Sequence, residues 1–463
     1  MAADSQRRAV VLIDGEHYPS VLRAALAALA EAGTNPVTAL LLGGTEKIAG
    51  ADAPMDLGVP TRWAGGAEGA YDPAAAAAAL DELIAQDRPD VVVDLSDEPI
   101  LGPRRRLQLA SHALVAGVAY EGPDFRLTPP PRPRVAGRPT VAVVGTGKTA
   151  VTADFARRLA AGGRTPVIVA MGRGGPPDPV VVSAGAAPDL EALLSIAEGG
   201  GHAASDFYED ALTSGVATVG ARRCGGGLAG AVAFSNVAEA VGAADDLPGD
   251  LTLLEGSGAA LPPVHADATA LIVPGDCDPE LLDGYLGRYR ILLADLIVVT
   301  MCEPPTSSPH QVEAVLEVIR STSRSLPVLC TVLRPVPMGP VAGAKAFFAM
   351  TAPAAVGESL AAWLESQHGC EVVATSNHLS NRPALRADLE RAPAFEVLLV
   401  ELKAAAVDVA ARIASAAGAQ VVFCDNRPVV VGPDGRATED GDASLAAAVD
   451  RIAGLADERF APR

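Results

Sequence analysis

Positive charge is scarce in this chain. Its 463 residues include 56 acidic side chains against 36 lysines and arginines, which gives a formal net charge of −20 at pH 7. Lysine occurs only at Lys47, Lys148, Lys345 and Lys403. Phosphate backbones and anionic lipid surfaces repel such a chain, so we expect no nucleic-acid and no membrane partner. Any basic cluster then stands out, because it opposes the field of the whole molecule.

Paired cysteines and long apolar runs are also missing. The six cysteines are scattered and form no CxxC pair, so we expect reduced thiols and no zinc site. No segment approaches the ~18 consecutive apolar residues of a membrane-spanning helix, and the start of the chain lacks the apolar core of a signal peptide. The sequence therefore predicts a cytoplasmic protein.

One short stretch organises what is present. Four apolar residues from Val141 to Val144 predict a buried strand, and Gly145, Thr146 and Gly147 turn it toward a helix that starts with Lys148 and Thr149. This is the order of a phosphate-binding P-loop, in which backbone N–H groups, a lysine and a Mg²⁺-binding hydroxyl face a nucleotide. The usual spacing places a further glycine five positions before Gly147, where this chain has Ala142. An ordinary glycine turn between strand and helix is the alternative interpretation.

The rest of the chain alternates apolar runs with helical patterns. Hydrophobic residues make up 49% of it, and the order of strand and helix predicts the α/β class with parallel sheets. A proline-rich segment from Thr128 predicts a stiff linker. We therefore expect a smaller N-terminal α/β domain over 1–127, a linker over 128–138, and a parallel-sheet P-loop core with a C-terminal extension over 139–463.

Polar side chains follow the first strands, at the sheet edge where ligands of parallel sheets bind. Most of the acids there are interpreted as helix caps and turn residues. The run Arg104-Arg105-Arg106 is interpreted as a solvated helix start. His17 is one turn histidine, which is more often structural than catalytic.

Further along, three glycine-rich segments carry cations. Arg173 lies in a Gly-Pro segment that suggests a mobile loop able to close on a phosphate. His202 and Asp206 lie in a second glycine-rich stretch. Arg222 and Arg223 precede three glycines, so their guanidiniums and the nearby backbone could hold phosphate oxygens, or the segment is a plain surface loop. Glu255 ends a buried strand, where an acid suits Mg²⁺ or a water molecule.

These segments together resemble a known family. The blocks are Leu12–Tyr18, Gly145–Thr149, Met171–Gly175, Arg222–Gly230, Leu254–Gly258 and Glu401–Asp408. In this order they resemble the cyclic 2,3-diphosphoglycerate synthetase family. The resemblance implies a dimer and an enzyme that uses ATP and Mg²⁺ to join the two phosphates of 2,3-diphosphoglycerate into a cyclic anhydride, releasing ADP and phosphate.

The chemistry assigns a role to each candidate. A triphosphate beside a bisphosphate needs several cations, and positioning with charge neutralisation would drive the reaction without a protein nucleophile. The residues Gly145, Thr146, Gly147, Lys148 and Thr149 are predicted to bind the nucleotide. Thr149 and Glu255 are predicted to hold Mg²⁺, and Lys148, Arg173 and Glu255 to be catalytic. The predicted substrate-binding residues are Arg173, His202, Asp206, Arg222, Arg223 and Lys403.

Two other functions fit the same residues. The short loop favours a nucleotide-binding regulatory protein with weak or no turnover, whereas the Arg222–Arg223 block disfavours it. A ligase or kinase of the same fold could act on another phosphorylated acid, because arginines that bind one bisphosphate bind others.

Overall fold

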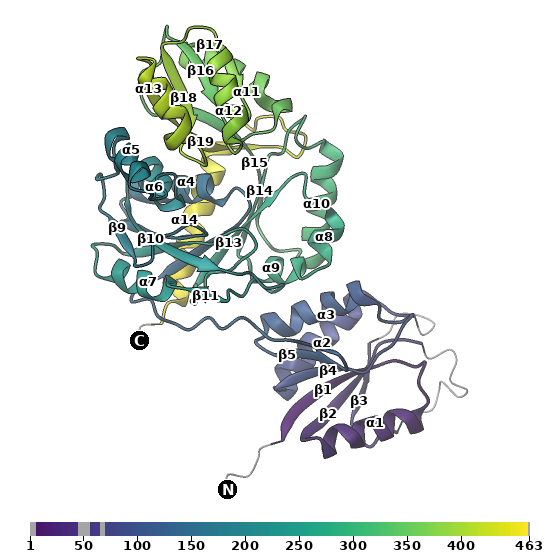
Figure 1. Cartoon of the computed structure of the whole chain (residues 1–463). Coiled ribbons are helices and arrows are strands. Elements are labelled where there is room, and N and C mark those ends of the chain that lie inside the picture. The colour runs from purple at the N-terminus through teal and green to yellow at the C-terminus, as the bar shows by residue number, and fades with distance from the viewer. Residues whose placement is uncertain (1–5, 45–55, 65–69, 462–463) are drawn as a thin grey trace. The chain divides into compact units, whose positions relative to one another are not determined.

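A computed structural model describes residues 6–44, 56–64 and 70–461 of the chain (Figure 1). It divides into two compact units. The N-terminal unit comprises Met1–Pro130 together with Asp278–Leu293, and the core unit comprises Pro131–Cys277 and Ala294–Arg463. The α/β class predicted from the alternating pattern is confirmed, because each unit is built on a largely parallel sheet.

The N-terminal unit holds a sheet of order β3-β2-β1-β4-β5-β6. All its neighbouring strands are parallel except β5 and β6. Strand β1 lies inside the sheet, and Val10 and Val11 are fully buried, as expected for a strand covered on both faces. Its elements are β1 (Arg7–Ile13), α1 (Pro19–Glu31), β2 (Thr34–Leu41), β3 (Thr61–Trp63), α2 (Pro73–Asp87), β4 (Val91–Asp94), α3 (Pro103–Val115), β5 (Ala119–Gly122) and β6 (Phe125–Leu127).

A segment from the middle of the chain completes this unit. Helices α8 (Pro279–Asp283) and α9 (Gly287–Leu293) follow a strand of the core unit, yet they pack against α3. Asp283 is the anchor: it accepts hydrogen bonds from Arg104 Nε at 2.9 Å and from Gln108 Nε2 at 2.7 Å. No sequence pattern assigned this segment to the N-terminal unit.

The core unit is organised around one large sheet. Among the described residues this sheet has the order β11-β10-β8-β12-β7-β13-β14-β15-β19-β18-β16-β17, with β9 paired to β10. The strands from β10 to β15 are parallel along this path, and β15 and β19 are antiparallel. Strand β7 therefore lies in the middle of the parallel region. The segments that follow β7, β8, β10 and β12 all begin at the same side of the sheet, where the strands have their carboxyl ends.

The core strands are β7 (Thr140–Gly145), β8 (Pro166–Gly172), β9 (Val180–Val182), β10 (Ala217–Cys224), β11 (Phe234–Ser235), β12 (Leu251–Glu255), β13 (Ala268–Pro274), β14 (Leu296–Thr300), β15 (Val328–Pro337), β16 (Lys345–Ala349), β17 (Glu371–Ser376), β18 (Val397–Glu401) and β19 (Gln420–Val431). The helices are α4 (Lys148–Ala161), α5 (Leu190–Glu198), α6 (Asp206–Ser214), α7 (Val237–Asp245), α10 (Pro309–Thr322), α11 (Ala354–His368), α12 (Arg382–Arg391), α13 (Arg412–Ala416) and α14 (Gly441–Arg459), and a π-helix, η3, spans Ala406–Ala411. Strands β16 to β18 lie at one end of the core unit with α11 to α13 around them (Figure 1).

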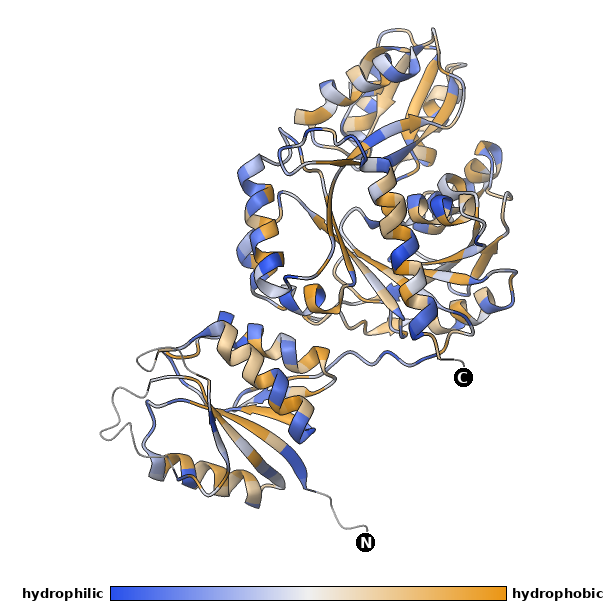
Figure 2. Cartoon of the chain, turned by 180° about the vertical axis from the view of Figure 1, so that it is seen from behind, coloured by the Kyte–Doolittle hydropathy of each residue, from blue (hydrophilic) through white to orange (hydrophobic). Residues whose placement is uncertain are grey.

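Apolar strands and half-apolar helices form the core. The central strands are largely apolar, whereas the helices carry polar residues along one face (Figure 2). Helix α4 buries Val151, Phe155 and Leu159, which recur every four residues and so form one face of the helix. Helix α14 packs against β13, β19 and α4. No helix of the described residues is long and apolar enough to cross a membrane.

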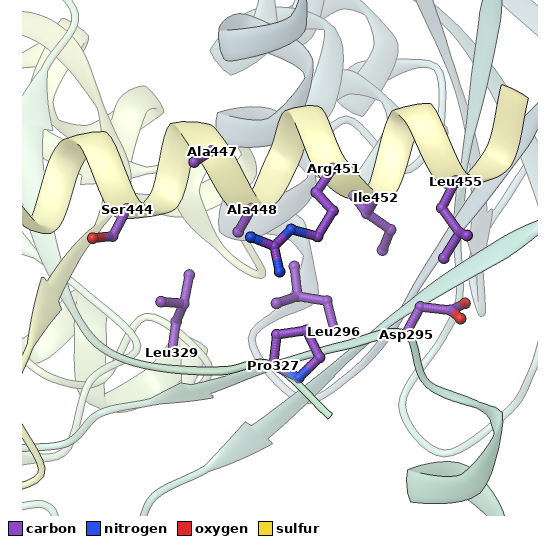
Figure 3. Close-up of a pocket in the computed structure, with 10 residues that line it drawn as sticks. All are labelled: Asp295, Leu296, Pro327, Leu329, Ser444, Ala447, Ala448, Arg451, Ile452 and Leu455. Carbon is purple, nitrogen blue, oxygen red and sulfur yellow. The ribbon is translucent and has the colours of Figure 1, made fainter. Parts of the chain in front are cut away.

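One cavity lies far from the glycine turn along the strands. It has a volume of about 290 Å³ and lies between α14 and the starts of β14 and β15 (Figure 3). Leu296, Leu329 and Ile452 give it an apolar lining, and Arg451 extends into it from α14. Because β7 runs parallel to these strands, this cavity lies at their amino ends, whereas the glycine turn lies at the carboxyl end of β7.

Candidate active site

The glycine turn between β7 and α4 has a backbone that only glycine adopts without strain. Gly145 has a φ of +118° and Gly147 a φ of +88°. A Cβ atom on Gly145 would lie 2.0 Å from the carbonyl oxygen of Ile272 on β13, so the turn is also in close contact with the neighbouring strand. Gly147 is the residue before the first turn of α4, whose N–H groups are free to bind an anion.

Lys148 occupies the start of α4 and is almost fully buried. Its Nζ lies 2.9 Å from Glu255 Oε1 and 3.5 Å from Asp206 Oδ2. Burial disfavours the charged amine, but Glu255 and Asp206 outweigh that effect and raise the pKa of Lys148 above its usual value. Lys148 is therefore a permanent cation held by two carboxylates.

Thr149 and Glu255 meet beside this lysine. The Thr149 hydroxyl donates a hydrogen bond of 2.6 Å to Glu255 Oε1. Glu255 is fully buried at the end of β12, next to β7 and β8 in the sheet. Its Oε2 atom has no hydrogen-bond partner among the described residues. The sequence placed these two residues together as ligands for a metal ion, and the structure brings them into contact.

Asp210 adds a second buried carboxyl to the cluster. It is fully buried on α6, and within the described part of the chain neither of its oxygens has a hydrogen-bond partner. Burial and the nearby Glu255 raise the pKa of Asp210 well above the usual aspartate value. Lys148 thus lies near three carboxyl groups, and among them Asp210 favours its neutral, protonated form.

Lys403 approaches the same helix from the C-terminal part of the core unit. Its Nζ lies 3.2 Å from Glu209 Oε1, one turn along α6 from Asp206. Burial raises the pKa of Glu209 to about 7, although Lys403 lowers it. Burial also acts against the charge on Lys403, but Glu209 and Glu401 raise its pKa above the usual value. Helix α6 therefore carries acids that hold Lys148 through Asp206 and Lys403 through Glu209.

Arg173 and Arg223 form a different kind of cluster. Arg223 Nη2 donates to the Ser257 carbonyl oxygen at 3.0 Å and to Ser257 Oγ at 3.1 Å. Arg173 Nη2 is 3.1 Å from the position of a Cβ on Gly258. Burial and the charge of Arg173 lower the pKa of Arg223. Neither arginine forms an ion pair with a carboxylate of the described residues.

This arginine pair adjoins the glycine turn. Gly258 forms an antiparallel bridge with Gly145, the last residue of β7. The backbone that Arg223 and Arg173 contact is therefore hydrogen-bonded to the loop that carries Lys148. The bridge thus connects the arginine pair to the turn that carries Lys148, at the carboxyl ends of the parallel strands.

Arg222 lies apart from its neighbour. Both residues belong to β10, and consecutive strand residues point to opposite faces of a sheet. The guanidinium of Arg222 packs over the Phe234 ring at 5.4 Å, and its backbone N–H donates to Asn236 Oδ1. The structure thus does not place Arg222 and Arg223 side by side.

His202 and Asp206 line a small pocket beside the Arg173 loop. Glycines of that loop, Gly172 and Gly174, also line it, and the His202 ring is 3.5 Å from a Cβ position on Gly174. Asp206 is half-buried and also contacts Lys148. The pocket that these two residues line therefore connects the Arg173 loop, through Asp206, to Lys148.

Sequence reasoning did not select Glu209 and Asp210. The signal was present, because Asp206, Glu209 and Asp210 are spaced three and four positions apart and so share one helix face. Their partners could not be found in this way, since Lys403 lies almost two hundred positions further along the chain. Among the described residues, no group of three or more His, Cys, Asp or Glu side chains is arranged to hold a metal ion.

Sequence profiles of known families match three consecutive parts of the chain. They are described as the N-terminal domain, the P-loop domain and the C-terminal domain of cyclic 2,3-diphosphoglycerate synthetase, and they match residues 8–128, 140–332 and 337–427. The chain is 47% identical to cyclic 2,3-diphosphoglycerate synthetase of Rubrobacter xylanophilus over 92% of this chain and 96% of that protein. It is 41% identical to the protein of the same name from Methanothermobacter thermautotrophicus, over 96% of each chain.

A solved structure also aligns with the chain. It is LpxK from Aquifex aeolicus in complex with ATP, with 14% identity, 69% of this chain and 90% of that chain covered, and a TM-score of 0.37. A likeness at that TM-score carries no argument about function.

Proposed function

The chain belongs to the cyclic 2,3-diphosphoglycerate synthetase family, and from this premise we propose that it joins the two phosphates of 2,3-diphosphoglycerate into a cyclic anhydride at the expense of ATP. One observation supports the proposal most directly. The Arg173–Arg223 pair, which lacks carboxylate partners among the described residues, contacts backbone that is bridged to the glycine turn. A nucleotide and a second polyanion can therefore bind side by side.

In this proposal the glycine turn binds the nucleotide. Backbone N–H groups from Gly145 to Thr149 surround the β- and γ-phosphates, and Lys148 neutralises part of their charge. Lys148 must then exchange Glu255 and Asp206 for phosphate oxygens. The lysine begins this exchange with its Nζ within 3.5 Å of both acids.

Arg173 and Arg223 bind the bisphosphate, with His202, Asp206 and Lys403 at the edge of the site and Arg222 supporting it from the other face of β10. One phosphate oxygen of the substrate attacks the γ-phosphorus, and ADP leaves. An oxygen of the second phosphate then attacks the phosphorus of the activated first phosphate. The bond from this phosphorus to the bridging oxygen breaks, and the former γ-phosphoryl group leaves with that oxygen as inorganic phosphate. Positioning and charge neutralisation by these cations supply the catalysis.

The chain offers suitable ligands for Mg²⁺. The Thr149 hydroxyl and the Glu255 carboxylate are hard oxygen donors in contact, and Glu255 Oε2 is buried without a partner in the described structure. Mg²⁺ binds with one or two carboxylates and completes its shell with phosphates and water. A bound ion would neutralise charge on the transferred phosphate.

The remaining parts of the proposal concern the whole molecule. We propose that the catalytic residues all lie in a core domain over 139–463, apart from the segment 278–293 that packs with the N-terminal unit, and that the linker 128–138 joins this core to a domain over 1–127. We also propose that the enzyme is a cytoplasmic homodimer.

Phosphorus NMR tests the reaction. Purified protein with ATP, Mg²⁺ and 2,3-diphosphoglycerate is expected to convert the two substrate resonances into those of a cyclic anhydride, with one ADP and one phosphate formed per product. Hydrolysis of ATP with an unchanged bisphosphate would contradict the proposal.

A regulatory protein that binds ATP without turnover is the second candidate. It is favoured by the short loop, in which Ala142 occupies the position of the usual first glycine. A thermal shift with Mg-ATP but no new phosphorus resonance would support it. A new resonance only with another phosphorylated acid would instead support a related ligase or kinase.

A further inference from the structure

The N-terminal unit contains an open pocket with a volume of about 720 Å³. It lies at the carboxyl end of β4 and at the first turns of α2 and α3, and the segment with α8 and α9 closes one side. Among its lining residues are Glu98, Arg104, Arg105, Gln108, Asp283 and Arg288. Three arginines thus face two carboxylates in a chain whose net charge is −20.

The arginines at the start of α3 are placed against the usual preference of a helix. The N-terminus of a helix carries a partial positive charge, which favours acids in the first turn. Helix α3 has no acid there, and its N-cap residue, Gly102, supplies no side-chain cap. Arg104 and Arg105 therefore do not complement the helix dipole, and they add positive charge at the N-terminus of α3.

The three arginines of this run differ in what they contact. Arg106 turns inward, where its Nε donates to Asp94 at 2.9 Å, so it is a structural residue. Arg105 lies over the Tyr71 ring at 4.7 Å and donates to the carbonyl oxygen of Ile100. These contacts fix Arg105 at the pocket without neutralising its charge.

Asp283 shows which ligand geometry the pocket accepts. Its Oδ2 accepts from Arg104 and Gln108, and its Oδ1 accepts from Arg288 Nε at 2.6 Å. These donors surround a planar oxyanion that belongs to the protein itself. Arginine forks bind carboxylates and phosphates in the same manner.

We propose that this pocket binds the phosphate group of a small phosphomonoester, at a site separate from the glycine turn. Arg105 and the N–H groups of the first turn of α3 contact the phosphate directly. Arg104 and Arg288 are shared between Asp283 and the ligand. This site does not depend on the proposed synthetase reaction, because all its residues belong to the N-terminal unit.

Hydrogen–deuterium exchange of the full chain with glycerol 3-phosphate locates the site. The expected result is slower exchange at the start of α3 and in peptides covering 278–293. Slower exchange confined to the segment around Lys148, or no change anywhere, would overturn the proposal.

Two variants with opposite expected effects sharpen the test, with affinity measured by calorimetry. Arg105→Gln should weaken glycerol 3-phosphate binding about tenfold, the loss expected for one charge-assisted contact. Asp283→Asn should tighten binding several-fold, because it removes the carboxylate that competes for Arg104 and Arg288. Exchange without ligand checks that 278–293 remains docked in this variant.

Arg23→Gln is the matched control. Arg23 is exposed in the same unit and donates to the Asp56 carbonyl oxygen, outside the pocket. Its loss should leave the affinity unchanged. An equal loss of affinity in Arg23→Gln and Arg105→Gln would show that the effect comes from the net charge of the protein and not from the pocket, which would overturn the proposal.

Discussion

The two cationic regions of the core unit differ in how their charge is balanced. Lys148 is buried and paired with Glu255 and Asp206, so its charge is already matched inside the protein. Arg223 contacts the backbone and hydroxyl of Ser257, Arg173 lies beside Gly258, and in the described structure neither arginine has a carboxylate partner. The first region must break internal contacts to bind an anion, whereas the second is prepared for one.

This difference separates the two steps of the proposed reaction. A buried ion pair is costly to break, since either charge is left in a medium of low polarity. A nucleotide that arrives with Mg²⁺ supplies both an anion for Lys148 and a cation for the acids. The arginine pair needs no such exchange, so the bisphosphate can bind without the metal ion.

The largest effect is expected from removing the buried cation. Lys148→Ala should lower turnover by about a thousandfold or more, because the transferred phosphate loses its main protein charge. Stability should also fall by about 3–5 kcal/mol, because Glu255 is left as an unpaired buried acid. Phosphorus NMR and urea unfolding measure the two losses.

The control for this variant is Lys345→Ala, which removes an exposed lysine at the start of β16. It should keep both activity and stability. Normal turnover in Lys148→Ala would show that the glycine turn is not part of the nucleotide site.

An intermediate effect is expected at the arginine pair. Arg223→Ala should weaken 2,3-diphosphoglycerate binding by about 2–5 kcal/mol, tens-fold or more, since the bound phosphate loses a charged partner in a recessed site. Affinity for ATP should stay nearly unchanged. Calorimetric titration of each ligand measures the two affinities.

Arg222→Ala is the matched control, because it removes the same charge from the opposite face of β10. It should change bisphosphate affinity less than Arg223→Ala does. An equal loss for ATP and bisphosphate in Arg223→Ala would place this arginine in the nucleotide site.

The strand, turn and helix around Lys148 could be predicted because local sequence determines them. The apolar run from Val141 to Val144 makes a strand, and the positive φ of Gly145 and Gly147 requires glycine. Glu255 could be placed at the same edge because parallel strands end together. The family was also recognised from such local blocks, and its membership is confirmed.

What depends on distant packing could not be predicted. The contact of Lys403 with Glu209 joins the segment after β18 to α6, and no local pattern encodes it. The docking of 278–293 on α3 depends in the same way on Asp283 and Arg104, which are far apart in sequence. The different surroundings of Arg222 and Arg223 follow from strand alternation, but the glycine-rich sequence around them did not predict a strand there.

The smallest effect concerns Glu209 and the pH dependence of stability. Burial raises the pKa of Glu209 from the ordinary value near 4.5 to about 7, so between these pH values the folded protein holds a proton that the unfolded chain has released. Stability contributed by this group is therefore present at low pH and lost as the pH rises toward 7. Glu209→Gln keeps the neutral form, so the wild type should lose about 2–3 kcal/mol relative to the variant between pH 5 and pH 8. Urea unfolding of both proteins at the two pH values measures the difference. Parallel pH profiles would show that Lys403 keeps Glu209 ionised throughout, and the Lys403–Glu209 pair would then be balanced internally in the same way as Lys148 and Glu255.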